Sequence, residues 1–181
     1  MNTALIAIPA HVTSPTATST GTKGSPAKIP RAFGATRAEQ PFSIAWAAGF
    51  ADGEACFHIA RQRYPGTNRS DTFVARVYIT QNSLEVLEHF RDGAGIDASI
   101  YKTKRTAGQN RQCYSLQYEG ARAMALVTLL LPHLVRKRAE ALTLWAYWVQ
   151  GEVGTRRGPK GVPPAVFAIR ERFFLKMRSL K

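Results

Sequence analysis

Acidic residues are scarce in this sequence. Its 181 residues include 12 Asp+Glu against 25 Lys+Arg, a formal net charge of +13 at pH 7. Such a balance does not determine a fold, but it favours a polyanion as the partner, because each Lys or Arg that neutralises a phosphate releases counterions. A hydrophobic fraction of 45% excludes disorder over most of the chain.

Cysteine and long hydrophobic runs are also nearly absent. Cys56 and Cys113 are too few for a disulfide scaffold and lack the C-x-x-C spacing of a zinc site, so we expect two reduced thiols in an intracellular protein. No stretch approaches the roughly 18 apolar residues of a membrane helix, and we expect a soluble chain. The length allows one well-buried domain and no second one of ordinary size.

Residues 1–40 differ in composition from the rest. They hold ten Ser and Thr, four prolines and one acid, Glu39, without a hydrophobic period. This predicts a flexible leader, which either organellar targeting or an unstructured extension would explain. We expect a core at 41–150 and a linker with a basic helix, packed on the core, at 151–181. The compartment is left open between a bacterial or phage cytoplasm and an organelle.

Hydrophobic periodicity predicts an α+β domain. A helix follows Ser43, and period-two alternation begins at Ala55 and again at Phe73. A capping box at 82–85 predicts a helix through Phe90. Two further strands are expected at 98–105 and 111–118, and helices at 121–131, 132–150 and 164–180. The order α-β-β-α-β-β-α-α-α predicts a four-stranded antiparallel sheet backed by helices on one face.

The outward strand positions carry donors, amides and aromatic rings but no carboxylate. A solvated face normally mixes both signs, so this bias favours contacts to phosphates and base edges. A strand of about nine residues spans about 30 Å, which suits duplex DNA better than an RNA loop. The expected DNA-binding residues are His58, Gln62, Tyr64, Arg76, Tyr78, Lys102, Lys104, Arg111, Ser115 and Gln117.

Two acids, Asp52 and Glu54, end the first helix. The helix macrodipole disfavours carboxylates there, and a divalent cation would compensate both the charge and the exposed carbonyls. The small residues on this helix would let a second helix approach closely; they are Ala47, Ala48, Gly49, Ala51 and Ala55. A core helix followed by a turn would account for the same pattern.

The segment Gly49-Phe50-Ala51-Asp52-Gly53-Glu54-Ala55, followed by Cys56-Phe57, resembles the signature of the LAGLIDADG homing endonucleases. The resemblance covers roughly residues 42–150, including the strand end Ile79-Thr80-Gln81 and the basic residues after Pro132. It implies the family's saddle-shaped sheet and hydrolysis of DNA with Mg²⁺ or Mn²⁺. By the same resemblance, the Glu54 carboxylate and the Gly53 carbonyl would bind the metal, Gln81 and Lys137 would line the active site, and Asp52 would shape the helix end.

One copy of the motif implies one catalytic acid per chain. Cutting both strands of a duplex calls for two, so the resemblance implies a homodimer in which the motif helices pack together and bring the two Glu54 side chains close. The expected function is that of a site-specific, intron-encoded double-strand DNA endonuclease. Two alternatives of the same fold stay open: a non-catalytic DNA-binding protein, and an intron RNA maturase that would use the basic residues Arg156, Arg157, Lys160, Arg170, Arg172, Lys176 and Arg178.

Overall fold

The computed structural model describes residues 42–66, 71–104, 111–154 and 162–181. The expected leader lies outside these ranges, as do Arg156, Arg157 and Lys160 of the expected linker. The elements are α1 (Ile44–Glu54), β1 (Ala55–Gln62), β2 (Thr72–Gln81), α2 (Leu84–Ala94), β3 (Ser99–Lys102), β4 (Tyr114–Glu119), α3 (Ala121–Leu130), α4 (Arg138–Gln150) and α5 (Pro164–Ser179). None of the helices in the described ranges is long and apolar enough to cross a lipid bilayer.

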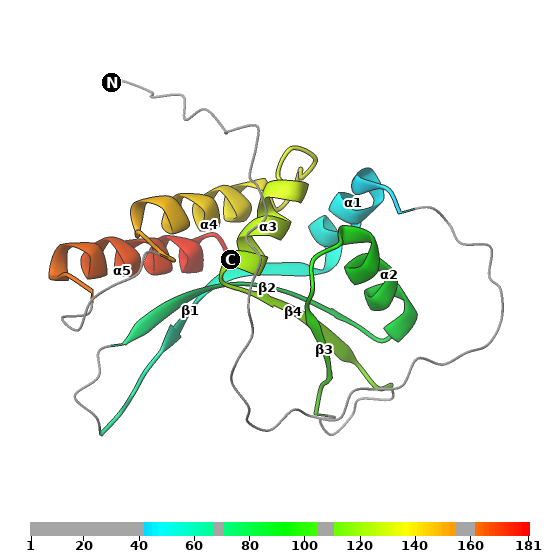
Figure 1. Cartoon of the computed structure of the whole chain (residues 1–181), viewed down its shortest axis with the longest axis horizontal. Helices are drawn as coiled ribbons and strands as arrows, with labels where there is room; N and C mark the ends of the chain where they lie inside the picture. The colour runs from blue at the N-terminus through cyan, green and yellow to red at the C-terminus, as the bar shows by residue number, and fades with distance from the viewer. Residues whose placement is uncertain (1–41, 67–70, 105–110, 155–161) are drawn as a thin grey trace. The chain divides into compact units, whose positions relative to one another are not determined.

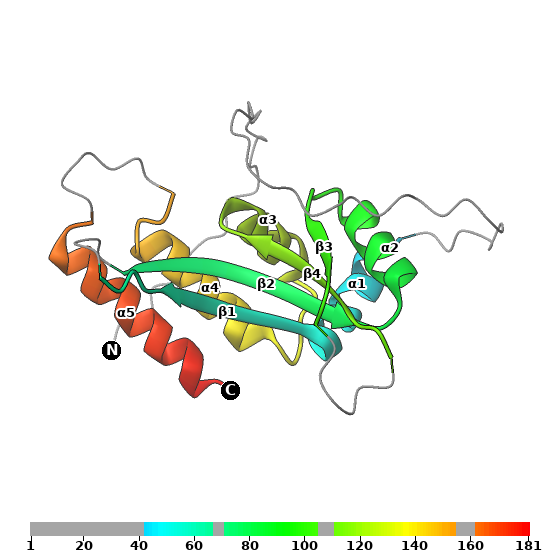
Figure 2. The same cartoon turned by 90° about the horizontal axis from the view of Figure 1, so that it is seen from below.

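The four strands form an antiparallel sheet in the order β1-β2-β4-β3. Figure 1 shows the helices on one side of this sheet. Figure 2 views the same elements from below, with the strands in front of α3 and α4. The sheet therefore has a helix-covered face and an open face, and the predicted α+β class with helices on one side is confirmed.

Period-two alternation places the core on the helix-covered face. Phe57 and Ile59 of β1 and Val77 and Ile79 of β2 are almost fully buried there, as predicted. On α4, the Tyr147 hydroxyl donates to the Phe73 carbonyl at 2.7 Å, which joins that helix to the sheet. Burial raises the pKa of Tyr147 to about 12, so the hydroxyl remains a donor.

Helix α1 begins as the sequence predicts and packs differently from the prediction. The Ser43 hydroxyl accepts a hydrogen bond from the backbone N–H of Trp46 at 3.1 Å. However, Ala47, Ala48 and Ala51 are at most 1% exposed and belong to the chain's own core. The expectation that these three alanines contact the helix of a partner chain is wrong, because they are buried where α1 packs against the sheet and α3 of its own chain. Gly49, from the same expected set, is exposed.

The ends of the other helices differ from the predicted ones. Helix α2 continues past the predicted end at Phe90 to Ala94, and the starts of α2 and α4 also differ. Ser83 precedes α2 but makes no side-chain cap hydrogen bond, so the predicted capping box does not form. Instead, the Asn82 N–H donates to Gln81 Oε1 at 2.8 Å. Pro132 lies in a connection at 131–137 between α3 and α4, and α4 begins only at Arg138.

Candidate functional site at the end of helix α1 and on the open sheet face

Asp52 connects the last turn of α1 to the segment between α3 and α4. Its two carboxylate oxygens accept the backbone N–H groups of Val135 and Lys137, each at 2.8 Å. Burial by itself would raise the pKa of Asp52, but hydrogen bonds from the Lys137, Val135 and Arg136 backbones and the Arg136 charge outweigh it and lower the pKa. Asp52 is therefore ionised at neutral pH and holds the 131–137 connection against α1.

Glu54, two residues further on, has different surroundings. It is the last residue of α1 and is exposed, and its side chain makes no hydrogen bond or ion pair with the described part of the chain. The last turn of α1 contains no basic residue that could offset the negative end of the helix. A cation from another segment reaches this end, since Arg136 Nη1 donates to the Asp52 carbonyl at 3.5 Å. The exposed Glu54 carboxylate beside the last carbonyls of α1 is a suitable partial ligand set for a hard divalent cation.

Gln81 and Lys137 come to this corner from two other segments. Ala55 pairs with Ile79, so the register carries Gln81, at the end of β2, alongside the last turn of α1. The backbone of Lys137 contacts Asp52, while Lys137 Nζ lies 3.5 Å from Glu140 Oε1. The structure thus brings together the chain segments that carry the expected catalytic residues, with the Lys137 ammonium paired to Glu140.

Sequence reasoning missed one cation near this corner, Lys181; Arg136 belongs to the expected basic residues after Pro132. A depression of about 530 Å³ is lined by Cys56, Arg136, Lys137, Ala139, Glu140, Leu180 and Lys181. Lys181 Nζ lies 2.8 Å from Cys56 Sγ, so residues 125 positions apart meet at the start of β1. Of the three cations that line the depression, Lys137 is paired with Glu140. No local signal marks Lys181, because the position of α5 on the sheet is a tertiary feature.

The open face consists of cross-strand rows fixed by the register. His58 of β1 lies opposite Arg76 of β2, which lies opposite Glu119 of β4. The residues of this face are Cys56, His58, Ala60, Gln62, Thr72, Val74, Arg76, Tyr78, Thr80, Ser99, Tyr101, Ser115, Gln117 and Glu119. Six of the ten expected DNA-binding residues lie on it: His58, Gln62, Arg76, Tyr78, Ser115 and Gln117. Tyr64 joins its edge, with the hydroxyl 3.3 Å from Gln62 Oε1.

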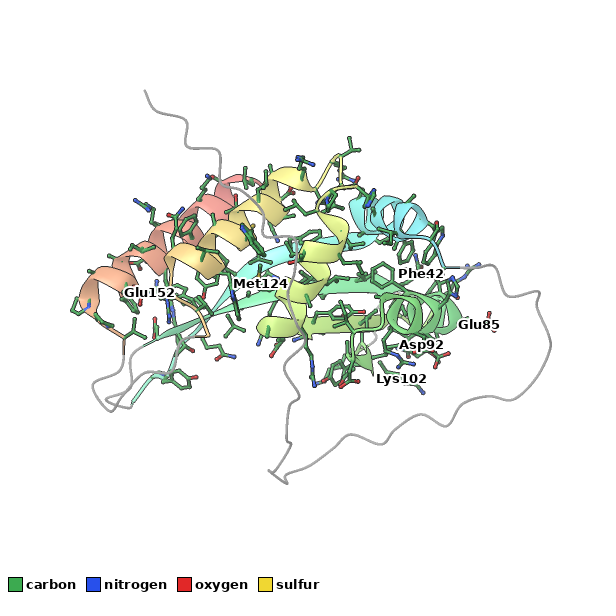
Figure 3. All side chains as sticks on the ribbon, turned by 45° about the horizontal axis from the view of Figure 1, so that its top comes forward. Phe42, Glu85, Asp92, Lys102, Met124 and Glu152 are labelled. Atoms are coloured by element: carbon green, nitrogen blue, oxygen red, sulfur yellow. The ribbon has the colours of Figure 1, made fainter. Side chains whose placement is uncertain are left out.

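The remaining three expected DNA-binding residues lie elsewhere. Lys102, labelled in Figure 3, pairs with Tyr114. It is two residues from Ile100 on the same strand, so both have the parity of the helix-covered face. Its expected outward position is wrong, and Ser99 and Tyr101 are the outward residues of β3. Lys104 and Arg111 are exposed but lie beyond the ends of β3 and β4. The apolar residues Ala98 and Ile100 were the signal for the correct parity.

The open face also carries an acid, which corrects the expectation of a face without carboxylates. Strand β4 ends at Glu119, one residue beyond the predicted end. Glu119 lies on the same face as Gln117, which donates a side-chain N–H to its carboxylate. Arg76 Nε lies 2.6 Å from Glu119 Oε1. The two groups form an ion pair, but the Nε–H bond is not aligned with the carboxylate oxygen. Arg76 Nε therefore has no hydrogen-bond acceptor among the described residues.

Two further open-face groups have shifted pKa values. Burial, with the nearby charges of Lys181 and Arg76, lowers the pKa of His58 to about 4, so this imidazole is neutral at physiological pH. A hydrogen bond with Cys56, together with burial, raises the pKa of Tyr78 to about 12. Both rings therefore present neutral hydrogen-bonding groups beside the Arg76 cation.

Comparison with known proteins gives a result at the level of structure. No protein-family model and no curated protein matches the sequence. The homing endonuclease I-CvuI, solved with the I-CreI DNA target, is 19% identical, with a TM-score of 0.59 over 76% of this chain and 81% of that chain. The homing endonuclease I-TnaI is 18% identical, with a TM-score of 0.55 over 78% of this chain and 100% of that one.

A third similar structure is a longer protein. The LAGLIDADG homing endonuclease I-SmaMI, bound to cleaved DNA, is 11% identical, with a TM-score of 0.63 over 84% of this chain and 49% of that chain. Identities this low establish the fold and leave activity to be argued from the site. The element order, the antiparallel sheet and these three matches together show that the chain has the fold of the LAGLIDADG homing endonucleases.

Proposed function

We propose that the protein is a site-specific DNA endonuclease that acts as a homodimer and uses a divalent metal. The observation that carries the proposal is Glu54, an exposed acid without a partner among the described residues, at the negative end of α1 and beside an open sheet face. The LAGLIDADG fold supports it, since I-CvuI was solved with a DNA target and I-SmaMI with cleaved DNA.

Glu54 and the Gly53 carbonyl are the proposed ligands of Mg²⁺ or Mn²⁺, hard cations that prefer oxygen. The described part of one chain contains no cluster of three His, Cys, Asp or Glu that could hold a metal. In the proposed homodimer, the second chain would supply the further ligands. When bound, such an ion activates water and neutralises charge on the scissile phosphate. Gln81 would orient the attacking water through its amide, and the Lys137 ammonium would stabilise negative charge on the phosphate oxygens.

The exposed side of α1 offers a surface for the partner chain. Ala45, Gly49 and Gly53 recur every four residues and are exposed, so they form one stripe on the helix. A Cβ atom built on Gly49 or Gly53 would meet no atom within 4 Å, so a second helix has room to approach. Two copies of this stripe in contact would bring two Glu54 side chains together. The match to 49% of I-SmaMI agrees with two copies forming one complete enzyme.

The RNA maturase alternative loses one of its expected residues. Arg170 is buried and donates from Nε to the Gly151 carbonyl at 2.8 Å and from Nη2 to the Glu152 carbonyl. It fixes the end of α4 to α5 and cannot contact RNA. The guanidinium groups of Arg172 and Arg178 lie over the rings of Phe173 and Phe174, as expected for cations that cover apolar surface.

The experiment is a cleavage assay with the full chain, Mg²⁺ and a plasmid carrying the uninterrupted sequence of the host gene at the insertion site. Wild-type protein should linearise the plasmid, and Glu54→Gln should lower the rate by at least about 10³-fold, because several kcal/mol of transition-state stabilisation are lost. DNA binding by the variant should persist. Glu85→Gln, at an exposed acid in the first turn of α2, is the matched control. Cleavage by Glu54→Gln at the wild-type rate would contradict the proposal.

A further inference from the structure

The row His58–Arg76–Glu119 on the open face contains unsatisfied hydrogen-bonding atoms. Three buried side-chain nitrogen or oxygen atoms of the described chain have no hydrogen-bond partner, and two of them, His58 Nδ1 and Arg76 Nε, belong to this row. The third, the Tyr118 hydroxyl, lies in the core. Native structures rarely leave such atoms unpaired, so contacts within the chain do not saturate this row. The side chains of Arg76 and Glu119 are 26% and 44% exposed, and their outer groups are left to bind a ligand.

The order of charges along the row restricts that ligand. Arg76 presents only donors and Glu119 only acceptors, and the two side chains come from neighbouring strands about 4.8 Å apart. The carboxylate lies at the Nε edge of the guanidinium, so the two terminal Nη groups can form a bidentate contact. A ligand that fits must present two hydrogen-bond acceptors to Arg76 and, next to them, one hydrogen-bond donor to Glu119.

Among base pairs in the major groove, G·C has this pattern. Guanine offers the N7 and O6 acceptors that arginine binds in bidentate fashion. The cytosine paired with it offers the N4 amino group, which donates to a Glu carboxylate. An A·T pair reverses both groups, since the adenine amino group would face the guanidinium and thymine O4 the carboxylate. The row would therefore favour G·C by attraction and reject A·T by repulsion.

We propose that Arg76 and Glu119 together recognise one G·C base pair of the target, with Glu119 as the residue that positions the Arg76 fork. The inference rests on the proposed DNA-binding function and goes beyond it by naming a base pair and an acid that helps to select it. In a two-fold symmetric target the G·C pair occurs once in each half-site. Glu119 also repels phosphates, so it lowers affinity for non-specific DNA while it sharpens selection.

The test is selection from a random duplex DNA library by the full chain in buffer without divalent metal, followed by sequencing of the bound fraction. Wild-type protein should enrich one G·C position per half-site by about 10- to 100-fold over other pairs, the discrimination expected of a good bidentate contact. Arg76→Lys should abolish the preference at that position. Glu119→Ala should weaken the preference there at least several-fold and bind non-specific duplex more tightly.

Two controls separate recognition from folding. Asp71→Ala removes the carboxylate of another arginine pair, Arg61–Asp71, which has the parity of the helix-covered face, and should leave every base preference unchanged. Glu119→Gln keeps the side-chain shape and an acceptor oxygen and should retain part of the preference, which serves if the alanine variant is unstable. Loss of preference at different positions in the Arg76 and Glu119 variants, no loss in either, or enrichment of another base pair overturns the inference. A wild-type protein that enriches no sequence overturns the proposed function as well.

Discussion

The two faces of the sheet each carry an arginine–carboxylate pair of nearly equal length, but the pairs have different surroundings. On the helix-covered side, Arg61 Nε lies 2.7 Å from Asp71 Oδ2, its Nη1 reaches Glu171 of α5 at 3.1 Å, and its guanidinium lies over the Phe73 ring. On the open side, Arg76 lies 2.6 Å from Glu119, without hydrogen-bond alignment.

The difference shows that a contact distance does not establish a role. The Arg61 pair joins β1, the start of β2 and α5, and its hydrogen bonds lie within the chain. The Arg76 pair lies on a face without a covering helix and leaves a buried nitrogen unsatisfied. We expect the covered face to respond to mutation mainly through stability and the open face mainly through DNA recognition.

The largest expected contrast in stability lies between adjacent residues of β1. Phe57 is 1% exposed on the covered face, so Phe57→Ala should lower the free energy of unfolding by about 3–5 kcal/mol. His58 lies on the open face, and His58→Ala should cost less than about 1 kcal/mol. Urea unfolding at one fixed protein concentration measures both, because a homodimer's stability depends on concentration. Equal losses would show that a further element covers the open face.

The next contrast in stability is between the two acids at the end of α1, Asp52 and Glu54. Asp52→Ala leaves the Val135 and Lys137 N–H groups without their acceptor and should lower the free energy of unfolding by about 1–3 kcal/mol. Glu54→Gln should change it by less than about 0.5 kcal/mol, because Glu54 has no partner among the described residues. Thermal unfolding of both variants, compared with wild type, tests this. A large loss in Glu54→Gln alone would reverse the two roles.

The open face should also make stability depend on pH through His58. The pKa of this residue falls from 6.5 to about 4 on folding, so between these values the unfolded chain binds a proton that the folded chain does not. The free energy of unfolding should therefore decrease as pH falls from 6.5 towards 4. His58→Gln should flatten this part of the profile, measured by urea unfolding at several pH values. An unchanged slope would assign the proton uptake to another group.

The smallest effect is expected for the Arg61 pair. Asp71 and Arg61 are each about a quarter exposed, so Asp71→Ala should cost only about 0.5–1 kcal/mol. Glu119→Ala, at a more exposed acid, should cost no more than that. Chemical denaturation measures both. Recognition should separate them, since only the Glu119 variant is expected to change base preference; a changed preference in Asp71→Ala would remove the distinction between the faces.

Prediction from the sequence was most successful where patterns are local. The alternation of β1 and β2 predicted which residues face the core, since side chains change sides at every residue. The same rule failed on β3, where the sequence analysis predicts Lys102 and Lys104 to point outward although Ile100 shares their parity. It also missed Glu119, because the predicted strand ended one residue early. A one-residue error at a strand end moves a charge onto or off a face.

The sequence by itself determined the order of the elements, the open-face and core residues of the two long strands, and the two acids at the end of α1. Only the tertiary structure decided which acid has a partner, because the N–H groups that bind Asp52 come from residues more than 80 positions away. It also decided that Arg76 lies beside Glu119 and that Ala47, Ala48 and Ala51 are buried. These relations depend on strand register and helix packing, which join distant segments that no local period connects.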